Sequence, residues 1–175
     1  MLTVKQIGRK LGGIEGSEIA EAAIVFPLLF TFLLGIIWFG RAFNIYSTIQ
    51  QAAQQGAIAA ARGTCATCGN NQTLDPAVVT AVTAVLQASG LQASQIPTNT
   101  KAPTPQSCIA GAVTCSNPGK ITVCRQAMLN SPATQPPQCG IIVSFQYPFT
   151  MSLPFTSLNM SQITLTAQAQ SRMEK

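Results

Sequence analysis

One uninterrupted apolar run near the start of the chain dominates its hydrophobic pattern. No residue from Ala22 through Gly40 can carry a charge, which is a run of roughly 19 residues. At about 1.5 Å of rise per residue, a helix of this length spans close to the ~30 Å hydrocarbon core of a bilayer. No second run of this kind follows. The pattern therefore predicts a single membrane span at about residues 20–40.

Behind Arg41 the apolar run gives way to an amphipathic helical pattern that ends at Gly63. The stripe has spacings of three and four residues and consists mostly of small side chains: Tyr46, Ile49, Ala53, Gly56 and Ala60. One continuous helix is therefore expected over residues 17–62. Its stripe can pack against the chain's own C-terminal domain or against neighbouring subunits, and both can hold on different faces.

Pro27 lies inside the apolar run. Proline removes the hydrogen bond to the carbonyl of Ala23, so a modest kink is expected there. Membrane helices tolerate such a proline. A packing role within an assembly is the alternative interpretation.

The remaining patterns predict a second, short helix and a small sheet. Asp75 at the cap, Pro76 in the first turn and Gly90 at the exit delimit the helix. Its core stripe is Val78, Val82, Val85 and Leu86. Strands are expected at residues 120–125, 140–147 and from 163 onward, with loop over residues 92–119. In the second strand Ile141, Val143, Phe145 and Tyr147 share one face, and in the third Ile163, Leu165, Ala167 and Ala169 alternate with polar residues.

Composition lowers the expectation of an enzyme. The chain has no histidine, five acidic residues and a net charge of +5 that is thinly spread. These features argue against histidine-based catalysis, a carboxylate metal site and nucleic-acid binding. Lys5, Arg9 and Lys10 precede the apolar run and Arg41 alone follows it closely, which predicts a cytoplasmic N-terminus. We expect no enzymatic activity, no cofactor and no metal.

The cysteines fit a location outside the cytoplasm. An even number in a small, loop-rich region predicts structural disulfides, and the six residues are Cys65, Cys68, Cys108, Cys115, Cys124 and Cys139. Six cysteines permit 15 connectivities. The spacing Cys65-x-x-Cys68 also suits a redox couple or half a zinc site, although neither a strand-to-helix setting nor a histidine supports these readings.

The start of the chain has the layout of a processed leader. A secretory signal peptide has a shorter apolar core and an Ala-x-Ala-like site, which this chain lacks after its run. Gly16 is instead followed at the fifth position by Glu21 and then by the apolar run, which resembles a type IV prepilin signal. That resemblance implies cleavage between Gly16 and Ser17 by a membrane-embedded peptidase. Gly13 offers a second register through Glu18, but only Gly16 leads straight into the run.

Glu21 has two interpretations that spacing alone does not separate. A carboxylate at the edge of the apolar run is costly unless paired, and the new amino terminus of Ser17 would supply a nearby cation, in the same chain or a neighbouring subunit. In the second case the pair would set the axial register of an assembly. Alternatively, Glu15, Glu18 and Glu21 simply favour the positive end of the helix dipole, with Ser17 as cap.

The block from Gly16 to Arg41, with the Ala/Gln-rich helix after it, resembles the TadE-like family of minor pilins and pseudopilins of tight-adherence (Tad/Flp) pili. The closing segments, Ile142 to Phe149 and Ile163 to Glu174, resemble the closing strands of that family. The resemblance implies as partners a prepilin peptidase, the other pilins of the pilus, an inner-membrane assembly platform and the lipid bilayer. Trp38 stands where family members often carry an acid, so that acid's role does not transfer. Residues 64–138 have no recognised counterpart.

Together these inferences predict an α+β protein. A leader over 1–16 precedes the long helix over 17–62, and an extracytoplasmic domain over 63–175 carries a three- to four-stranded antiparallel sheet, a short helix and disulfide-stapled loops. The expected location is the bacterial inner membrane, in a single pass, with a place in the pilus also open. An uncleaved envelope protein with a disulfide-rich binding domain is the alternative function, and a thiol oxidoreductase is a third.

Overall fold

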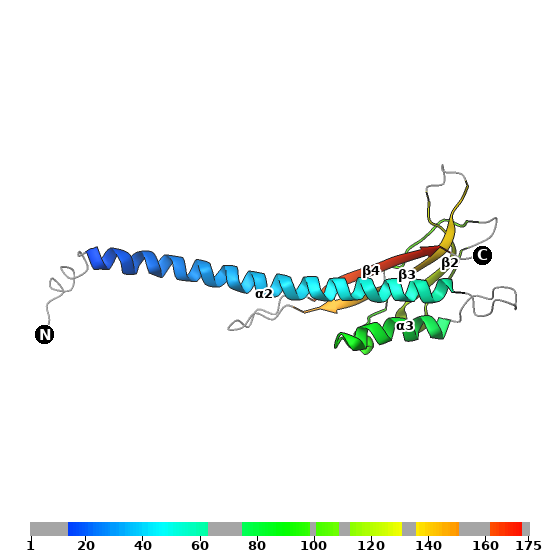
Figure 1. The fold of residues 1–175 in the computed structure, drawn as a ribbon, viewed down its shortest axis with the longest axis horizontal. Helices are drawn as coiled ribbons and strands as arrows, with labels where there is room; N and C mark the ends of the chain where they lie inside the picture. The colour runs from blue at the N-terminus through cyan, green and yellow to red at the C-terminus, as the bar shows by residue number, and fades with distance from the viewer. Residues whose placement is uncertain are drawn as a thin grey trace. The chain divides into compact units, whose positions relative to one another are not determined.

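A computed structural model of the chain describes residues 14–62, 75–98, 101–108, 113–130, 136–150 and 162–172. The chain divides into two compact units, residues 1–42 and 43–175, and each is described by itself. The helices among the described residues are α2 (Ile14–Ala61) and α3 (Asp75–Ala88), with two short 3₁₀ turns, Ala93–Gln95 and Pro118–Lys120 (Figure 1). The strands are β1 (Thr114–Ser116), β2 (Thr122–Met128), β3 (Cys139–Phe149) and β4 (Ile163–Arg172).

The expected long N-terminal helix is present as α2, which runs from Ile14 to Ala61, whereas the sequence placed it at residues 17–62. It passes through Pro27, and the hydroxyl of Thr31 donates a hydrogen bond of 2.8 Å to the Pro27 carbonyl. Proline leaves the carbonyl four residues earlier without its usual backbone donor. Flanking helix-forming residues such as Leu28 and Leu29 allow the helical conformation to continue beyond this position.

The four strands form one antiparallel sheet in the order β1-β2-β3-β4. The expected strands are present with somewhat different ends, whereas β1 lies in a stretch that the sequence predicted to be loop. Three residues of mixed polarity carry too little periodicity to reveal a strand. Between Cys124 and Ala127 the pairing of β2 with β3 shifts by one residue, and Gln126 has a left-handed φ of 58°. This extra residue is a β-bulge.

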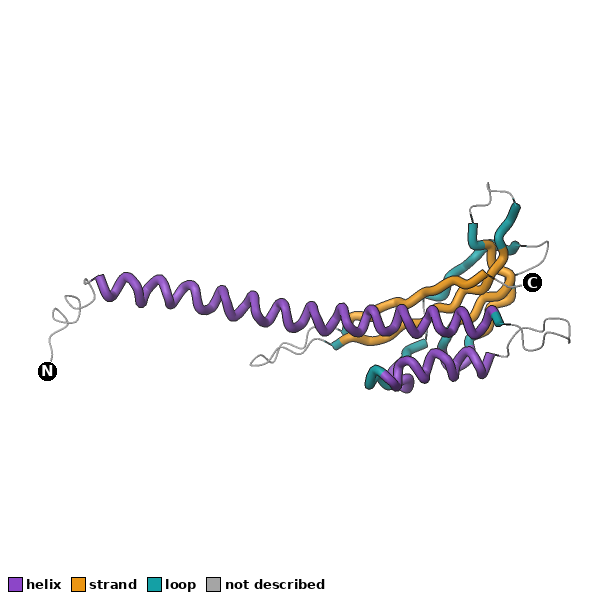
Figure 2. The backbone as a smooth tube through the Cα atoms, viewed as in Figure 1, coloured by secondary structure: helices purple, strands orange, loops and turns teal. Residues whose placement is uncertain are grey.

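One face of the sheet and the two helices enclose the core of the second unit (Figure 2). The second part of α2 contributes small residues, α3 contributes its valine and leucine stripe, and β3 contributes alternate side chains. Fully or almost fully buried members include Ile49, Ala52, Ala53, Ala57, Ala60, Val78, Val82, Leu86, Ile141, Val143, Phe145 and Tyr147. The predicted α+β arrangement is therefore confirmed.

Gly56 lies where α2 approaches α3 and β3 most closely. A Cβ atom at this position would lie 2.6 Å from Val82 Cγ2 and 3.4 Å from Val143 Cγ1. The small-residue stripe of α2 thus packs on the chain's own domain, one of the two possibilities left open by the sequence. Tyr46 is the exception, since it keeps 44% of its surface exposed, and the buried stripe begins only with Thr48 and Ile49.

The ends of α3 agree with the sequence signals. The helix begins at Asp75, with Pro76 in its first turn. At its end Gly90 adopts a φ of 74°, its amide donates to the Gln87 carbonyl, and the Leu91 amide donates to the Leu86 carbonyl at 2.8 Å. This is the Schellman pattern, in which two orphan carbonyls of the last turn are satisfied.

Candidate functional site

The first part of α2 presents large apolar side chains on all sides. Among the described residues, one helix is long and apolar enough to cross a membrane, and the apolar window that qualifies it is 0% buried. Eleven large apolar residues in this part keep about half or more of their surface accessible: Ile24, Val25, Phe26, Leu28, Leu29, Phe30, Phe32, Leu33, Ile36, Ile37 and Phe39. A soluble protein rarely exposes so continuous an apolar surface. The helix indicates a single-pass membrane protein.

Glu21 lies on α2 directly before this apolar surface, and its side chain is exposed. Gly16 and Ser17 lie in the first turn of the same helix, which begins at Ile14. The amides of a first helical turn have no acceptors within the helix, so this turn unwinds more readily than the turns after it. The expected cleavage bond therefore lies in the first turn of α2.

Trp38 and Arg41 form a pair at the other end of the apolar surface. They are three residues apart, so their side chains lie on the same side of the helix. The Arg41 guanidinium carbon lies 5.7 Å from the centroid of the Trp38 ring, which is a cation–π distance. Spacing in the sequence places the two residues near each other but does not specify this contact.

Two disulfides link strands and loops of the second unit. Cys115 and Cys124 face each other directly on β1 and β2, with their Cα atoms 4.0 Å apart. Cys108 is bonded to Cys139 at the start of β3, with a Cα separation of 5.5 Å. All cysteines among the described residues are therefore in disulfides, in keeping with the predicted stapled loops. Cys65 and Cys68 lie outside the described residues.

Cys108 also belongs to a short segment that continues the sheet beside β2. The Cys108 amide donates to the Gln126 carbonyl at 3.0 Å, and the Met128 amide donates to the Gln106 carbonyl at 2.9 Å. Ser107 forms an isolated antiparallel bridge with Ala127. The Cys108–Cys139 disulfide thus joins this segment to β3, which pairs with the other edge of β2. It closes a separation of 31 residues and so limits the freedom of the unfolded chain.

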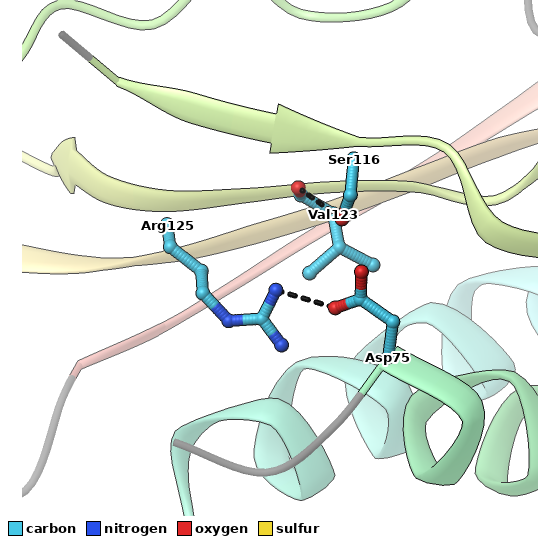
Figure 3. Close-up of polar contacts among 4 residues, drawn as sticks. All are labelled: Asp75, Ser116, Val123 and Arg125. Atoms are coloured by element: carbon cyan, nitrogen blue, oxygen red, sulfur yellow. Dashed lines mark hydrogen bonds and ion pairs between the residues drawn. The ribbon is translucent and has the colours of Figure 1, made fainter. Parts of the chain in front are cut away.

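An ion pair holds the beginning of α3 to the sheet (Figure 3). Arg125 Nη1 lies 2.5 Å from Asp75 Oδ1, and both side chains are largely buried, with 14% and 28% of their surfaces exposed. Ser116 Oγ lies beside them and donates to the Val123 carbonyl at 3.4 Å. Burial raises the pKa of Asp75, but the nearby Ser116 hydroxyl, the hydrogen bond from Arg125 and the charge of Arg125 outweigh it, so the pKa lies below its ordinary value.

Two further polar features of the sheet were not anticipated from the sequence. The Tyr147 hydroxyl donates to Gln95 Oε1 at 2.9 Å, which connects β3 to the turn after α3. Ser144 and Gln146, on the face of β3 opposite Phe145, are 0% and 3% exposed. The sequence pattern assigned Ile141, Val143, Phe145 and Tyr147 to one face, and period-two alternation alone does not predict that the opposite, polar face is buried as well. Burial of a polar face depends on the surroundings of the strand, which a local pattern does not reveal.

The described residues contain no group of three or more His, Cys, Asp or Glu side chains that could hold a metal ion. Their polar clusters link secondary structure elements to one another. The predicted cleavage bond between Gly16 and Ser17 lies on α2, as do Glu21, the exposed apolar surface and the Trp38–Arg41 pair.

Comparison with known proteins gives one family. The sequence model of the family described as TadE-like protein matches residues 16–57. No curated protein and no solved structure matches the chain. The matched segment begins at Gly16, includes Glu21 and the apolar surface, and ends inside the part of α2 that packs on the sheet. The resemblance predicted from the sequence is confirmed, and residues 16–57 form a TadE-like segment.

Proposed function

We propose that this protein is a minor pilin or pseudopilin, a structural or assembly component of a Tad-type adhesive pilus. The observation that carries this proposal is the TadE-like match over residues 16–57. This segment coincides with an exposed apolar helix surface suited first to lipid and later to packing against other pilin helices. The chain would act through assembly rather than through catalysis.

In this proposal a prepilin peptidase removes residues 1–16 on the cytoplasmic side, and the chain retains α2 from Ser17 onward. The family match begins at Gly16, which supports the same register. The first turn of α2 needs to unwind for a peptidase to reach this bond. The free energy of unwinding is small because few intrahelical hydrogen bonds are lost. The inner membrane would hold the mature helix until it joins other pilins on the assembly platform.

Glu21 would then pair with the new Ser17 amino terminus, in its own chain or in a neighbouring subunit. Its side chain is exposed on α2 and so is accessible to a second subunit. A carboxylate at the edge of the hydrocarbon core gains most from a partner cation, because an isolated ion there is costly. A pair of this kind between subunits would fix their relative axial position.

The test of processing is N-terminal sequencing of the full protein, extracted from membranes of cells that express the prepilin peptidase. A mature chain that begins at Ser17 is expected. Gly16→Val should leave the leader attached, because a β-branched side chain obstructs the close approach of a peptidase to the backbone. The matched Gly13→Val variant should still be cut before Ser17.

The alternative outcomes have distinct meanings. A chain that begins at Ile14 would establish the Gly13 register. An intact Met1 in the presence of an active peptidase would contradict the pilin proposal. Sheared fibres can then be probed for the mature chain, since its presence would show a fibre component and its absence, in cells that make pili, an assembly factor at the membrane.

The role of Glu21 is tested by Glu21→Gln, which removes the charge and preserves the size of the side chain. We expect membrane insertion at the parental level and fewer assembled pili, measured from the fibre fraction after shearing. Glu18→Gln is the matched control on the preceding turn. Parental pilus levels in the Glu21 variant would leave helix-end electrostatics as the role of this residue.

A second candidate function is an uncleaved envelope protein whose domain binds another surface component. The observation in its favour is that the family match ends at residue 57 and leaves the disulfide-linked sheet outside it. The sequencing experiment separates the two functions, because only the pilin proposal requires a chain that begins at Ser17.

A further inference from the structure

Arg41 and Arg125 have different surroundings. Arg125 pairs with Asp75, whereas among the described residues Arg41 contacts the Trp38 ring. A guanidinium carries five N–H donors, and a contact with an aromatic ring provides none of them with an oxygen acceptor. Arg41 is also exposed. These donors are therefore available to an acceptor outside the chain.

The position of the pair identifies the class of acceptor. Glu21 and Arg41 bracket the uncharged run, and the 20 steps between them correspond to about 30 Å of helix, which equals the thickness of the hydrocarbon core. If the run spans the bilayer, Arg41 reaches the headgroup layer at the non-cytoplasmic surface. Lipid phosphate is the anionic oxygen acceptor concentrated in that layer.

We propose that Trp38 and Arg41 form a binding site for a lipid phosphate, which fixes the axial position of α2 in the membrane. The guanidinium matches a phosphate with two parallel N–H donors, a geometry that a lysine ammonium does not offer. The indole restricts the Arg41 rotamer and itself prefers the membrane interface. The occupant of this site is the phosphodiester of a phospholipid headgroup, and the inference requires the membrane span but no particular role in a pilus.

The chain contains one tryptophan, so selectively excited tryptophan fluorescence reports from this site alone. The full-length protein is reconstituted into phosphatidylglycerol vesicles that carry bromine on the acyl chains, either near the headgroup or near the bilayer centre. The ratio of shallow to deep quenching measures the depth of Trp38. Vesicles of digalactosyldiacylglycerol, a neutral lipid without phosphate, form the comparison bilayer.

In phosphatidylglycerol, Arg41→Gln should move Trp38 deeper and lower the ratio of shallow to deep quenching by about twofold, since one phosphate contact per chain is lost. Arg41→Lys keeps the charge but lacks the paired N–H donors, so it should give a ratio between those of the parent and Arg41→Gln. Arg62→Gln, at the end of α2, is the matched control and should leave the ratio unchanged. In the galactolipid, the parent and Arg41→Gln should give the same ratio.

Two results would overturn this inference. One is an equal quenching ratio for the parent and Arg41→Gln in phosphatidylglycerol. The other is a shift of equal size in the galactolipid, which would assign the effect to side-chain polarity without phosphate. Circular dichroism of each reconstituted variant verifies that α2 remains helical. Because no pilus is needed, failure here is distinguishable from failure of the proposed function.

Discussion

The two parts of α2 differ in which side chains they expose and which they bury, although they belong to one helix. Before Ala42 the large side chains of Ile, Leu and Phe are exposed on all sides, whereas after Phe43 small residues are buried every third or fourth position. Large flexible side chains suit lipid, which surrounds a helix evenly. Alanine and glycine suit a fixed partner, because they allow backbones to approach closely. Side-chain size therefore separates the anchor from the packing surface more clearly than hydrophobicity does.

Two phenylalanines offer the strongest test of this comparison. Phe145 is 0% exposed in the sheet, whereas Phe32 is 68% exposed on α2. Phe145→Ala should lower the free energy of unfolding of the domain by about 3–5 kcal/mol, because it leaves a cavity. Phe32→Ala should leave it unchanged. Urea-dependent proteolysis of the full chain in detergent micelles measures both, and equal losses would contradict the division of roles.

A positive charge should impair membrane insertion when it is placed on the first part of α2 but not when it is placed on the second part. Leu33→Arg puts a cation at the centre of the apolar surface, at a cost of about 2.5–3.5 kcal/mol for membrane insertion. Gln54→Arg puts the same cation on an exposed position of the second part. The fraction of protein that remains in membranes after alkaline carbonate extraction should fall for Leu33→Arg alone. Retention of both variants would argue against a membrane span at this position.

Gly40 and Gly56 test the same comparison with a smaller expected effect, because one lies in each part of α2. A Cβ atom at Gly40 has nothing within 4 Å, while at Gly56 it would lie 2.6 Å from Val82 Cγ2. Gly56→Ala should lower the free energy of unfolding by about 1–2 kcal/mol, since overpacking outweighs the gain in helix propensity. Gly40→Ala should not destabilise the domain. The same proteolysis assay applies, and an unchanged Gly56 variant would show that Val82 moves aside without cost.

The smallest expected effect concerns the pH dependence of the second unit. The pKa of Asp75 is lower in the folded protein than its ordinary value, so its stabilisation is present above about pH 4 and is lost as pH falls through the folded pKa. Partial exposure limits the effect to less than about 1 kcal/mol. Asp75→Asn should reduce the fall in urea midpoint between pH 5 and pH 2. Arg172→Gln should retain the parental pH profile, and the same reduction there would exclude the Asp75–Arg125 pair as its source.

Local patterns anticipated most of the elements because each element has its own period. The β3 residues Ile141, Val143 and Phe145 alternate with period two, and the buried stripe of α3 repeats with the period of a helix. The sequence-based predictions failed where an element was too short to show a period, as in β1, or where the surrounding structure decided whether a residue is buried. Tyr46 fits the stripe by spacing, yet the core begins one turn later, so it remains exposed.

The sequence by itself determined the apolar anchor, the bounding signals of α3, the inward face of β3 and the TadE-like character of residues 16–57. These depend on residues close together in the chain. Only the tertiary structure decided the pairing of Cys108 with Cys139 and of Cys115 with Cys124, and the contact of Asp75 with Arg125 across 50 residues. These disulfide and ion-pair partners are brought together by strand register and by the packing of α3 on the sheet. Residue spacing along the chain determines neither the register nor the packing.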